Sequence, residues 1–241
     1  MPHEDGWAVN ISHVYSDSDL TLDPKRYSRK AVELRSALAS LPHFELGEAV
    51  DFIPEGHTSG GCKAAAVPSA VYRYVELQDI GYGDFRPHEM RGWELPGRAK
   101  HFAEPGDVFF GSIWGSATKW CYIPDTDDNI VVTNGCFRCR MKAPMDRYLP
   151  DLLSYLGSEG WGVQMRSFSR GSDGLAEVSL ADAKKIIIPV LSDGARRNMS
   201  GQMGSFQCGK GTVSSLVESM RKSGEISYPE PPKRPSHIVL V

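Results

Sequence analysis

The chain has 241 residues, of which 41% are hydrophobic and 24% are charged, and this composition is ordinary for a soluble globular protein. It contains no apolar run near the ~20 residues that a transmembrane helix needs, and its start, MPHEDGWAVN, has neither the basic nor the apolar region of a signal peptide. Five cysteines, an odd number, favour reduced thiols over a disulfide framework. We therefore expect a cytoplasmic protein with no membrane partner.

The net charge of −3 conceals a gradient along the chain. Residues 1–61 carry five Lys and Arg against ten Asp and Glu, and residues 62–135 carry seven against ten. Residues 136–191 carry eight against six, and residues 192–241 carry seven against four. This small C-terminal excess of positive charge permits a polyanion to be held there. It is well short of the excess that binds DNA by charge alone.

The first predicted element is a helix that begins at Asp23. This residue is a good N-cap, and Pro24 suits the first helical position. Apolar residues then recur with helical spacing, at Tyr27, Ala31, Leu34, Leu38 and Leu41. The stripe has two interpretations: it covers the core of its own domain, or it docks a partner helix as in a short coiled coil.

A polar loop is expected after the helix, at residues 55–63. The segment EGHTSGGCK is too rich in Gly, Ser and Thr for regular structure. It is not a phosphate-binding P-loop, because Lys63 is followed by Ala64 and the magnesium-binding hydroxyl is missing. Nucleotide hydrolysis at this loop is therefore not expected.

Strand-like runs lie on both sides of this loop. Residues 44–53 predict a turn into a first strand. Residues 71–80 alternate cleanly between two faces and give the clearest predicted strand. Residues 85–100 follow without a regular period, so we expect an irregular stretch there.

The stretch 105–140 is the part around which the rest is arranged. Short β-branched and aromatic runs separated by turn formers predict consecutive strands of a strongly bent sheet, at Val108–Phe110, Trp120–Ile123, Ile130–Val132 and Phe137–Met141. The loop at residues 111–116 is rich in Gly and Ser and carries a Trp. Such a loop on a rigid support is typical of a recognition surface. We interpret Asp125, Asp127 and Asp128 as a turn rather than a metal cluster.

Helical spacing returns at Asp146, which is predicted to cap a helix that Gly157 ends. A second short helix is expected at residues 161–168, and one or two capped turns at residues 178–185. Residues 186–191 predict a buried strand, which Pro189 confines to a sheet edge or to its own end.

Beyond residue 191 the composition shifts to Gly, Ser, Arg and Lys. A weak helix at residues 213–222 and a Pro-rich exit indicate an appended tail that is partly mobile. We therefore divide the chain into an N-terminal segment with a helix (1–43), a main domain (44–191) and a C-terminal tail (192–241).

Taken in order, these pieces resemble the target recognition domain of the specificity subunits of type I restriction-modification systems. The resemblance lies in the entry helix, in YRYVELQDIGYGDF, in PGDVFFGSIWGSATKWCYI, and in the closing helices that end in IIIPVL. It covers about residues 20–191 and rests on their order rather than on one sharp motif. It implies an α+β fold: a β-rich body with short helices packed on it, one N-terminal helix and a C-terminal appendage.

A full specificity subunit has two such domains separated by long helices, whereas this chain has one. The resemblance therefore implies a half-size or stand-alone protein, and it leaves open how the chain docks on an enzyme. It implies a non-catalytic, sequence-specific DNA-binding protein without a cofactor. Its partners would be double-stranded DNA, a DNA methyltransferase and a restriction subunit, in phage defence.

Candidate DNA contacts are residues in the expected loops whose side chains suit base edges or phosphates. Arg can bind a guanine edge with two hydrogen bonds, and Lys usually binds phosphate. These candidates are Thr58, Ser59, Lys63, Tyr82, Arg86, Arg91, Trp114, Ser116, Lys119, Arg166 and Arg170. Trp114 is as compatible with a core position as with a contact.

Two other functions stay open, a metal-dependent nuclease and a protein-interaction subunit of the same kind of system. The sequence lacks the NPPY or DPPY tetrapeptide of adenine methyltransferases, and its histidines form no HxH or HExxH motif. Cys136 and Cys139 have the spacing of half a zinc site without a second pair. In a strand, residues three apart also point to opposite faces.

Overall fold

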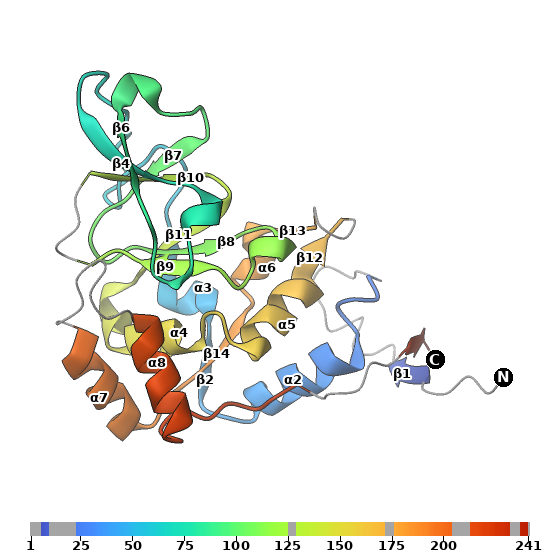
Figure 1. Cartoon of the computed structure of the whole chain (residues 1–241). Helices are drawn as coiled ribbons and strands as arrows, with labels where there is room; N and C mark the ends of the chain where they lie inside the picture. The colour runs from blue at the N-terminus through green and yellow to red at the C-terminus, as the bar shows by residue number, and fades with distance from the viewer. Residues whose placement is uncertain are drawn as a thin grey trace.

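The computed structural model describes residues 6–9, 23–124, 129–171, 176–203, 213–231 and 237–240. The fold is α+β, as predicted. A helical body lies on one side of a central sheet, and a smaller β-rich lobe projects from the other side (Figure 1).

The central sheet has five strands in the order β3-β11-β8-β9-β5. Their bounds are β3 (Val50–Phe52), β5 (Tyr82–Gly83), β8 (Val108–Gly111), β9 (Trp120–Tyr122) and β11 (Cys136–Met141). The central strand β8 is buried on both faces, so its neighbouring residues enter different cores. Phe110 packs toward the helices, and Phe109 packs toward the second sheet. A strand buried on both faces has an almost continuous apolar sequence, as the VFF run does.

The second sheet forms the lobe and has four strands in the order β6-β4-β10-β7. Their bounds are β4 (Val71–Val75), β6 (His88–Arg91), β7 (Ala99–Phe102) and β10 (Ile130–Thr133). β4 and β10 are parallel, and the other pairs are antiparallel. The expectation of one bent sheet across 105–140 is therefore wrong in one respect. β10 leaves the central sheet and joins the lobe.

The helices cover the other face of the central sheet. They are α2 (Arg29–Ala39), α3 (Leu46–Ala49), α4 (Leu149–Tyr155), α5 (Glu159–Phe168), α6 (Leu180–Ala183), α7 (Asp193–Met203) and α8 (Val213–Lys222). Three strand pairs complete the fold: β14 (Ile187–Pro189) with β2 (His43–Glu45), β12 (Ser169–Arg170) with β13 (Glu177–Val178), and β1 (Gly6–Val9) with β15 (His237–Leu240).

Helix α2 begins later than predicted. Asp23 accepts a hydrogen bond from the Lys25 N–H in a preceding turn, whereas Ser28 is the N-cap and its hydroxyl accepts from the Ala31 N–H. Leu34 and Leu38 lie in the main core, and the helix contacts α5. The apolar stripe therefore covers the core of its own chain. Leu41 lies beyond the helix and is exposed.

Other boundaries differ where local geometry competes with strand formation. Residues 44–53 are split by α3, and the strand predicted at 71–80 ends at Val75 and is followed by a 3₁₀ helix. The stretch 85–100 contains β6 and a short 3₁₀ helix (Gly92–Glu94) instead of being wholly irregular.

Predictions near the C-terminus were closer to the structure. The helices after residue 146 are confirmed, with Gly157 in a left-handed conformation after the first of them, and so is the strand that ends at Pro189. The predicted cap is wrong, because Asp146 lies inside a 3₁₀ helix (Ala143–Tyr148) and Tyr148 is the N-cap of α4. The helix at Val213–Lys222 is also confirmed. Helix α7 was not predicted.

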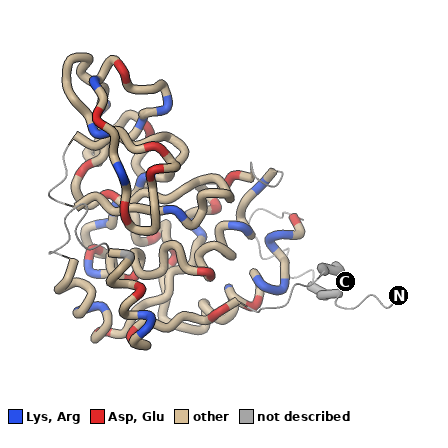
Figure 2. Tube along the Cα trace, viewed as in Figure 1, with Lys and Arg blue, Asp and Glu red and all other residues tan. Residues whose placement is uncertain are grey.

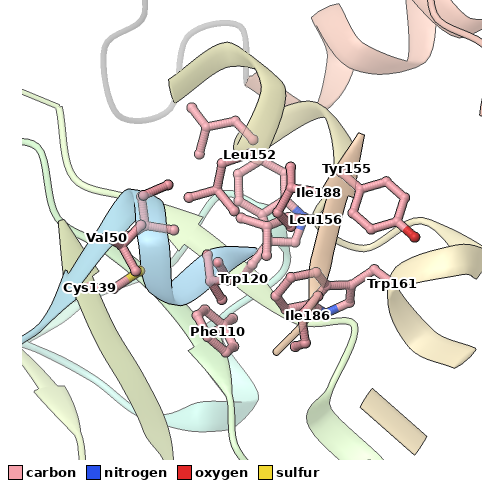
Figure 3. Packing of buried hydrophobic residues seen from close by; sticks show 14 of the residues in the cluster. Val50, Phe110, Trp120, Cys139, Leu152, Tyr155, Leu156, Trp161, Ile186 and Ile188 are labelled. Atoms are coloured by element: carbon pink, nitrogen blue, oxygen red, sulfur yellow. The ribbon is translucent and has the colours of Figure 1, made fainter. Parts of the chain in front are cut away.

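One apolar cluster joins the central sheet to the helices. Phe110, Trp120 and Cys139 of the sheet pack against Leu152 of α4 and Trp161 of α5 (Figure 3). Buried residues of α2 belong to the same cluster, as do buried residues of α7 and α8. The division at residues 43/44 and 191/192 stays a prediction, but the apolar core crosses both boundaries.

Candidate nucleic-acid interface

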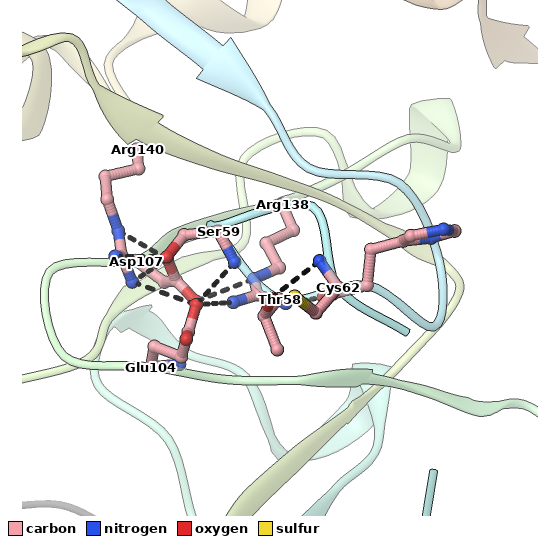
Figure 4. A network of polar contacts seen from close by, with 8 residues as sticks. Thr58, Ser59, Cys62, Glu104, Asp107, Arg138 and Arg140 are labelled. Atoms are coloured by element: carbon pink, nitrogen blue, oxygen red, sulfur yellow. Dashed lines mark hydrogen bonds and ion pairs between the residues drawn. The ribbon is translucent and has the colours of Figure 1, made fainter. Parts of the chain in front are cut away.

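A buried ionic network holds the predicted loop at residues 55–63 against the central sheet. Arg138 of β11 binds Asp107 through Nε (2.6 Å) and Glu104 through Nη2 (2.8 Å), and its Nη1 donates to the His57 carbonyl (2.7 Å). Arg140 binds the other oxygen of Asp107, and its Nη1 donates to the Ser59 hydroxyl (2.8 Å). Figure 4 shows these side chains converging from β11 and from the turn before β8.

The environment of the two carboxylates differs. Burial raises the pKa of Asp107, although the two arginine charges oppose this shift. Burial would also raise the pKa of Glu104, but hydrogen bonds from Ser59 and the charges of Arg138 and Arg140 outweigh it and lower that pKa. The Ser59 N–H donates to Glu104 Oε2 at 2.7 Å. This segment is therefore a loop, as predicted. Hydrogen bonds with Arg138, Arg140 and Glu104 hold it against the central sheet.

Inside the loop, Thr58 and Lys63 have different surroundings. The Thr58 hydroxyl oxygen accepts from the Cys62 N–H (3.1 Å), which closes the turn. Lys63 is exposed, and its backbone forms an isolated antiparallel β-bridge with His57. The loop lies beside β7, because the Gly56 N–H donates to the Lys100 carbonyl (2.9 Å).

Four exposed cations of this loop and of the lobe form no ion pair among the described residues: Lys63, Arg86, Arg91 and Lys100. Lys100 was not among the predicted contacts, and its strand, β7, was not predicted either. By contrast, Arg98 pairs with Glu76 (2.6 Å). We name the four unpaired residues the lobe cations.

Tyr82 and Lys119 lie near Arg86, around the 3₁₀ helix that follows β4 (Leu77–Asp79). Lys119 Nζ donates to the Leu77 carbonyl (3.1 Å), and the Arg86 N–H donates to the Asp79 carbonyl (3.0 Å). Tyr82, in β5, pairs with Trp120 next to Lys119 and is 58% exposed. The structure therefore brings Lys119 to the segment that carries Tyr82 and Arg86, which are already close in the sequence.

The remaining predicted contacts have partners within the fold. Trp114 is half-buried against the main core, and the guanidinium of Arg166 lies over its ring at 4.9 Å. Ser116 is buried, and its hydroxyl donates to the Ile113 carbonyl. Arg170 pairs with the buried Asp182 (3.2 Å). We leave these four residues out of the proposed interface.

Charge is distributed evenly over the lobe. Basic and acidic residues are interspersed along its chain, without a continuous basic stripe in this view (Figure 2). Residues 54–102 contain six Lys and Arg and six Asp and Glu. Any polyanion bound there would be held by a few placed contacts rather than by the overall field of the lobe.

His101 is a buried titratable residue that sequence reasoning missed. Its ring is hydrogen-bonded to the Cys136 backbone, and its Nδ1 has no partner within the described part of the chain. Burial, and then the charge of Arg138, lower the pKa of His101 to about 4. It lines a cavity of about 250 Å³ together with Phe52, Asn134 and Phe137.

The two cysteines of the CxxC spacing point into different cores. Cys136 packs between the two sheets, and Cys139 packs toward the helices. Burial raises the pKa of Cys136 to about 12. In the described part of the chain, no group of three His, Cys, Asp or Glu residues is placed to hold a metal ion. Asp125, Asp127 and Asp128 lie outside the described residues.

No helix among the described residues combines the length and the apolar character that a membrane span requires. No protein-family model matches the sequence, and no curated protein matches it. Its place among known proteins therefore comes from comparison of structures.

The fold is shared with specificity subunits of type I restriction-modification systems. A chain from a structure of the type I R-M system aligns over 76% of this chain with a TM-score of 0.53 and 21% identity. The HsdS subunit from Thermoanaerobacter tengcongensis aligns over 76% with a TM-score of 0.50 and 19% identity. The chain spans less than half of both proteins, 45% of the first and 43% of the second. At 21% and 19% identity, the structural similarity establishes a shared fold and nothing beyond it.

Proposed function

We propose that this protein is a non-catalytic specificity protein that reads a short duplex sequence and directs a partner enzyme to it. The observation that carries the proposal is the fold, which is shared over 76% of the chain with a subunit of a type I R-M system. Its partners would be double-stranded DNA, a DNA methyltransferase and a restriction subunit, in the cytoplasm. The chain aligns with less than half of that subunit, so the proposal concerns the part that the two proteins share.

We assign the reading surface to the lobe cations together with Tyr82. Thr58, Ser59 and Lys119 border this surface, and their side chains are hydrogen-bonded within the fold. The exposed guanidinium groups of Arg86 and Arg91 are suited to base edges, because a guanidinium can donate two parallel hydrogen bonds to a guanine. Lys63 and Lys100 are suited to phosphates, which fix the register of a protein on DNA without reading its sequence. The ionic network around Arg138 supports the proposal by holding the loop of Lys63 in one conformation.

A binding selection tests the function directly. The purified chain, alone and with its partner methyltransferase, is incubated with a pool of duplexes that contain a randomised segment, and the bound fraction is sequenced. We expect one short motif to be enriched. A pool that stays random in both cases would contradict the proposal.

Substitutions test the assigned residues. Arg86→Ala and Arg91→Ala should each weaken binding to the selected duplex by about 1–3 kcal/mol and relax the motif at one position, if the side chains touch base edges. Lys63→Ala should weaken binding to all duplexes alike and lower the salt dependence, since one phosphate contact is lost. Arg197→Ala is the matched control, because Arg197 is exposed on α7 and lies outside the lobe. If Arg197→Ala and Arg91→Ala change the affinity for DNA equally, Arg91 is not part of the proposed reading surface.

A further inference from the structure

An exposed apolar group lies at the end of the lobe. Trp93 is 67% exposed, Val67 is 56% exposed and Val71 is 48% exposed. Val71 pairs with Arg91 at the end of β6, and Figure 1 shows β6 at the far end of the projecting lobe. We name Val67, Val71 and Trp93 the tip group. Trp114 differs from Trp93, because Arg166 and the main core cover much of its ring.

The backbone under the tip group is tightly interlocked. The Gly92 N–H donates to the Ala70 carbonyl (2.9 Å), and the Trp93 N–H donates to the Pro68 carbonyl (3.2 Å). A Cβ atom on Gly92 would lie 2.1 Å from the Val67 carbonyl oxygen, so only glycine permits this approach. The two segments that carry the tip group are therefore held against each other.

The tip group is also anchored to the sheet below it. The Tyr72 hydroxyl accepts from the Val67 N–H (2.9 Å), and the Tyr72 ring packs against Phe102. Tyr72 and Tyr74 form a small core with Val131, which Met90 and Leu95 help to cover. With this core already filled, Trp93 is presented to solvent on a rigid support.

We propose that Trp93 is a wedge that enters a groove of duplex DNA and stacks against a base at an opened step. This inference rests on the proposed function and extends it from reading bases to deforming the duplex. An aromatic face stacks on any base, and apolar side chains that enter base steps unstack and kink DNA. Arg91 lies two residues away with an exposed guanidinium that forms no ion pair in the described part of the chain, so a base edge can be bound beside the wedge.

Size favours DNA over a protein as the occupant. A stable protein interface buries about 800 Å² on each partner, and three side chains at the end of a lobe are a small part of such an area. A wedge needs only one large side chain, a rigid support and a neighbouring cation. The tip group and Arg91 together provide all three.

The test compares Trp93→Ala and Trp93→Phe with Leu41→Ala. Leu41 is an exposed apolar residue that follows α2 in the helical body, so its loss controls for removing apolar surface. Affinity is measured on the selected duplex, alone and with the partner methyltransferase. Base unstacking is followed by the fluorescence of 2-aminopurine placed at successive positions of that duplex. Thermal unfolding checks that each variant is folded.

We expect Trp93→Ala to bind about 5- to 150-fold more weakly, which corresponds to about 1–3 kcal/mol for one stacked base. It should also abolish a rise in 2-aminopurine fluorescence at one position, and Trp93→Phe should retain part of both effects. Leu41→Ala should match the wild type.

The outcomes separate the two proposals. If the wild type enriches no motif, the proposed function fails and the wedge fails with it. If the wild type binds its motif and Arg91→Ala weakens binding, but Trp93→Ala behaves like Leu41→Ala, only the wedge is overturned. Weaker binding with unchanged 2-aminopurine fluorescence also overturns it, because Trp93 would then touch DNA without opening a step. Loss of methyltransferase binding with unchanged affinity for DNA would assign the tip group to a protein contact.

Discussion

Asp107 and His101 are buried titratable residues whose protonation is tied to folding. Asp107 is fully buried between two arginines and accepts hydrogen bonds from both. A buried ion pair contributes little net stability, but removal of one partner leaves an unpaired buried charge and is costly. His101 is held in its neutral form by the same surroundings, because burial and the charge of Arg138 disfavour the imidazolium.

The lowered pKa of His101 predicts a loss of stability in acid. In the unfolded chain the ring takes up a proton below about pH 6.5, whereas in the folded protein it does so only near pH 4. The contribution of neutral His101 to the free energy of unfolding is complete above pH 6.5 and is lost as the pH falls toward 4. Between pH 7 and pH 5 we expect the free energy of unfolding to fall by about 2 kcal/mol from this residue. Urea unfolding at a series of pH values measures it.

His101→Gln is the matched variant, because glutamine keeps a donor for the Cys136 backbone and does not titrate. Its free energy of unfolding should depend less steeply on pH than that of the wild type between pH 7 and pH 5. Parallel curves for the two proteins would contradict the assignment of this acid sensitivity to His101.

Helix α2 illustrates how packing selects the first residue of an element. Two residues, Asp23 and Ser28, can cap a helix, and the structure uses Ser28. Starting at Ser28 leaves residues 23–27 in turns, and it places Arg26 where its guanidinium binds the buried Asp182 at 2.6 Å. The packing of Arg26 and of the apolar stripe therefore decides the start of the helix, where local propensity allows both.

Ser28→Ala should lower the free energy of unfolding by about 1 kcal/mol, because it removes the hydroxyl that accepts from the Ala31 N–H. Ser36→Ala is the control, since Ser36 is an exposed residue in the middle of the same helix. Its effect should lie within about 0.5 kcal/mol of zero. Thermal or urea unfolding distinguishes the two, and equal effects would show that the cap contributes nothing specific.

The whole molecule has one main core that extends beyond the predicted tail boundary. Met199 of α7 and Met220 of α8 are buried in the same cluster as Leu152 of α4. Arg196 of α7 pairs with the buried Asp151 of α4 at 2.8 Å. Both contacts hold α7 on the helical body rather than leaving it as a loose extension.

Met199→Ala should therefore destabilise the entire protein, by about 2–5 kcal/mol, because it leaves a cavity in the main core. Arg197→Ala, two residues earlier and exposed on the same helix, should change the stability by less than about 0.5 kcal/mol. The measurement is urea unfolding followed by near-ultraviolet circular dichroism. If Met199→Ala leaves the main transition unchanged, α7 unfolds separately, and the boundary at residue 191 describes a real division.

Sequence reasoning located most elements of the central sheet and of the helices. The runs at Val108–Phe110, Trp120–Ile123 and Phe137–Met141 are strands of that sheet, as predicted. Their apolar periodicity is a local property, so it can be read without knowing the partners. Helix α7 was missed because its sequence is polar and contains two glycines, so its buried side is recognisable only once α4 lies beside it.

The candidate site was predictable only in part. Residue type and an expected loop position selected Arg86 and Arg91 together with Ser116 and Arg170. The first two are exposed and form no ion pair with any residue that the structure describes, whereas the other two have partners within the fold. Whether a cation is available depends on which carboxylates and carbonyls surround it. Those neighbours come from distant parts of the chain.

By itself the sequence determined the α+β composition, the order of the main strands and helices, and the resemblance to a target recognition domain, because these depend on local periodicity and on the order of segments. Only the tertiary structure decided that Ile130–Thr133 leaves the central sheet for the lobe and that α7 and α8 cover the main core. It also decided that Trp93 is left exposed at the end of a rigid support. Strand pairing and burial depend on contacts between residues that are far apart in the chain, so the local pattern of one segment does not specify them.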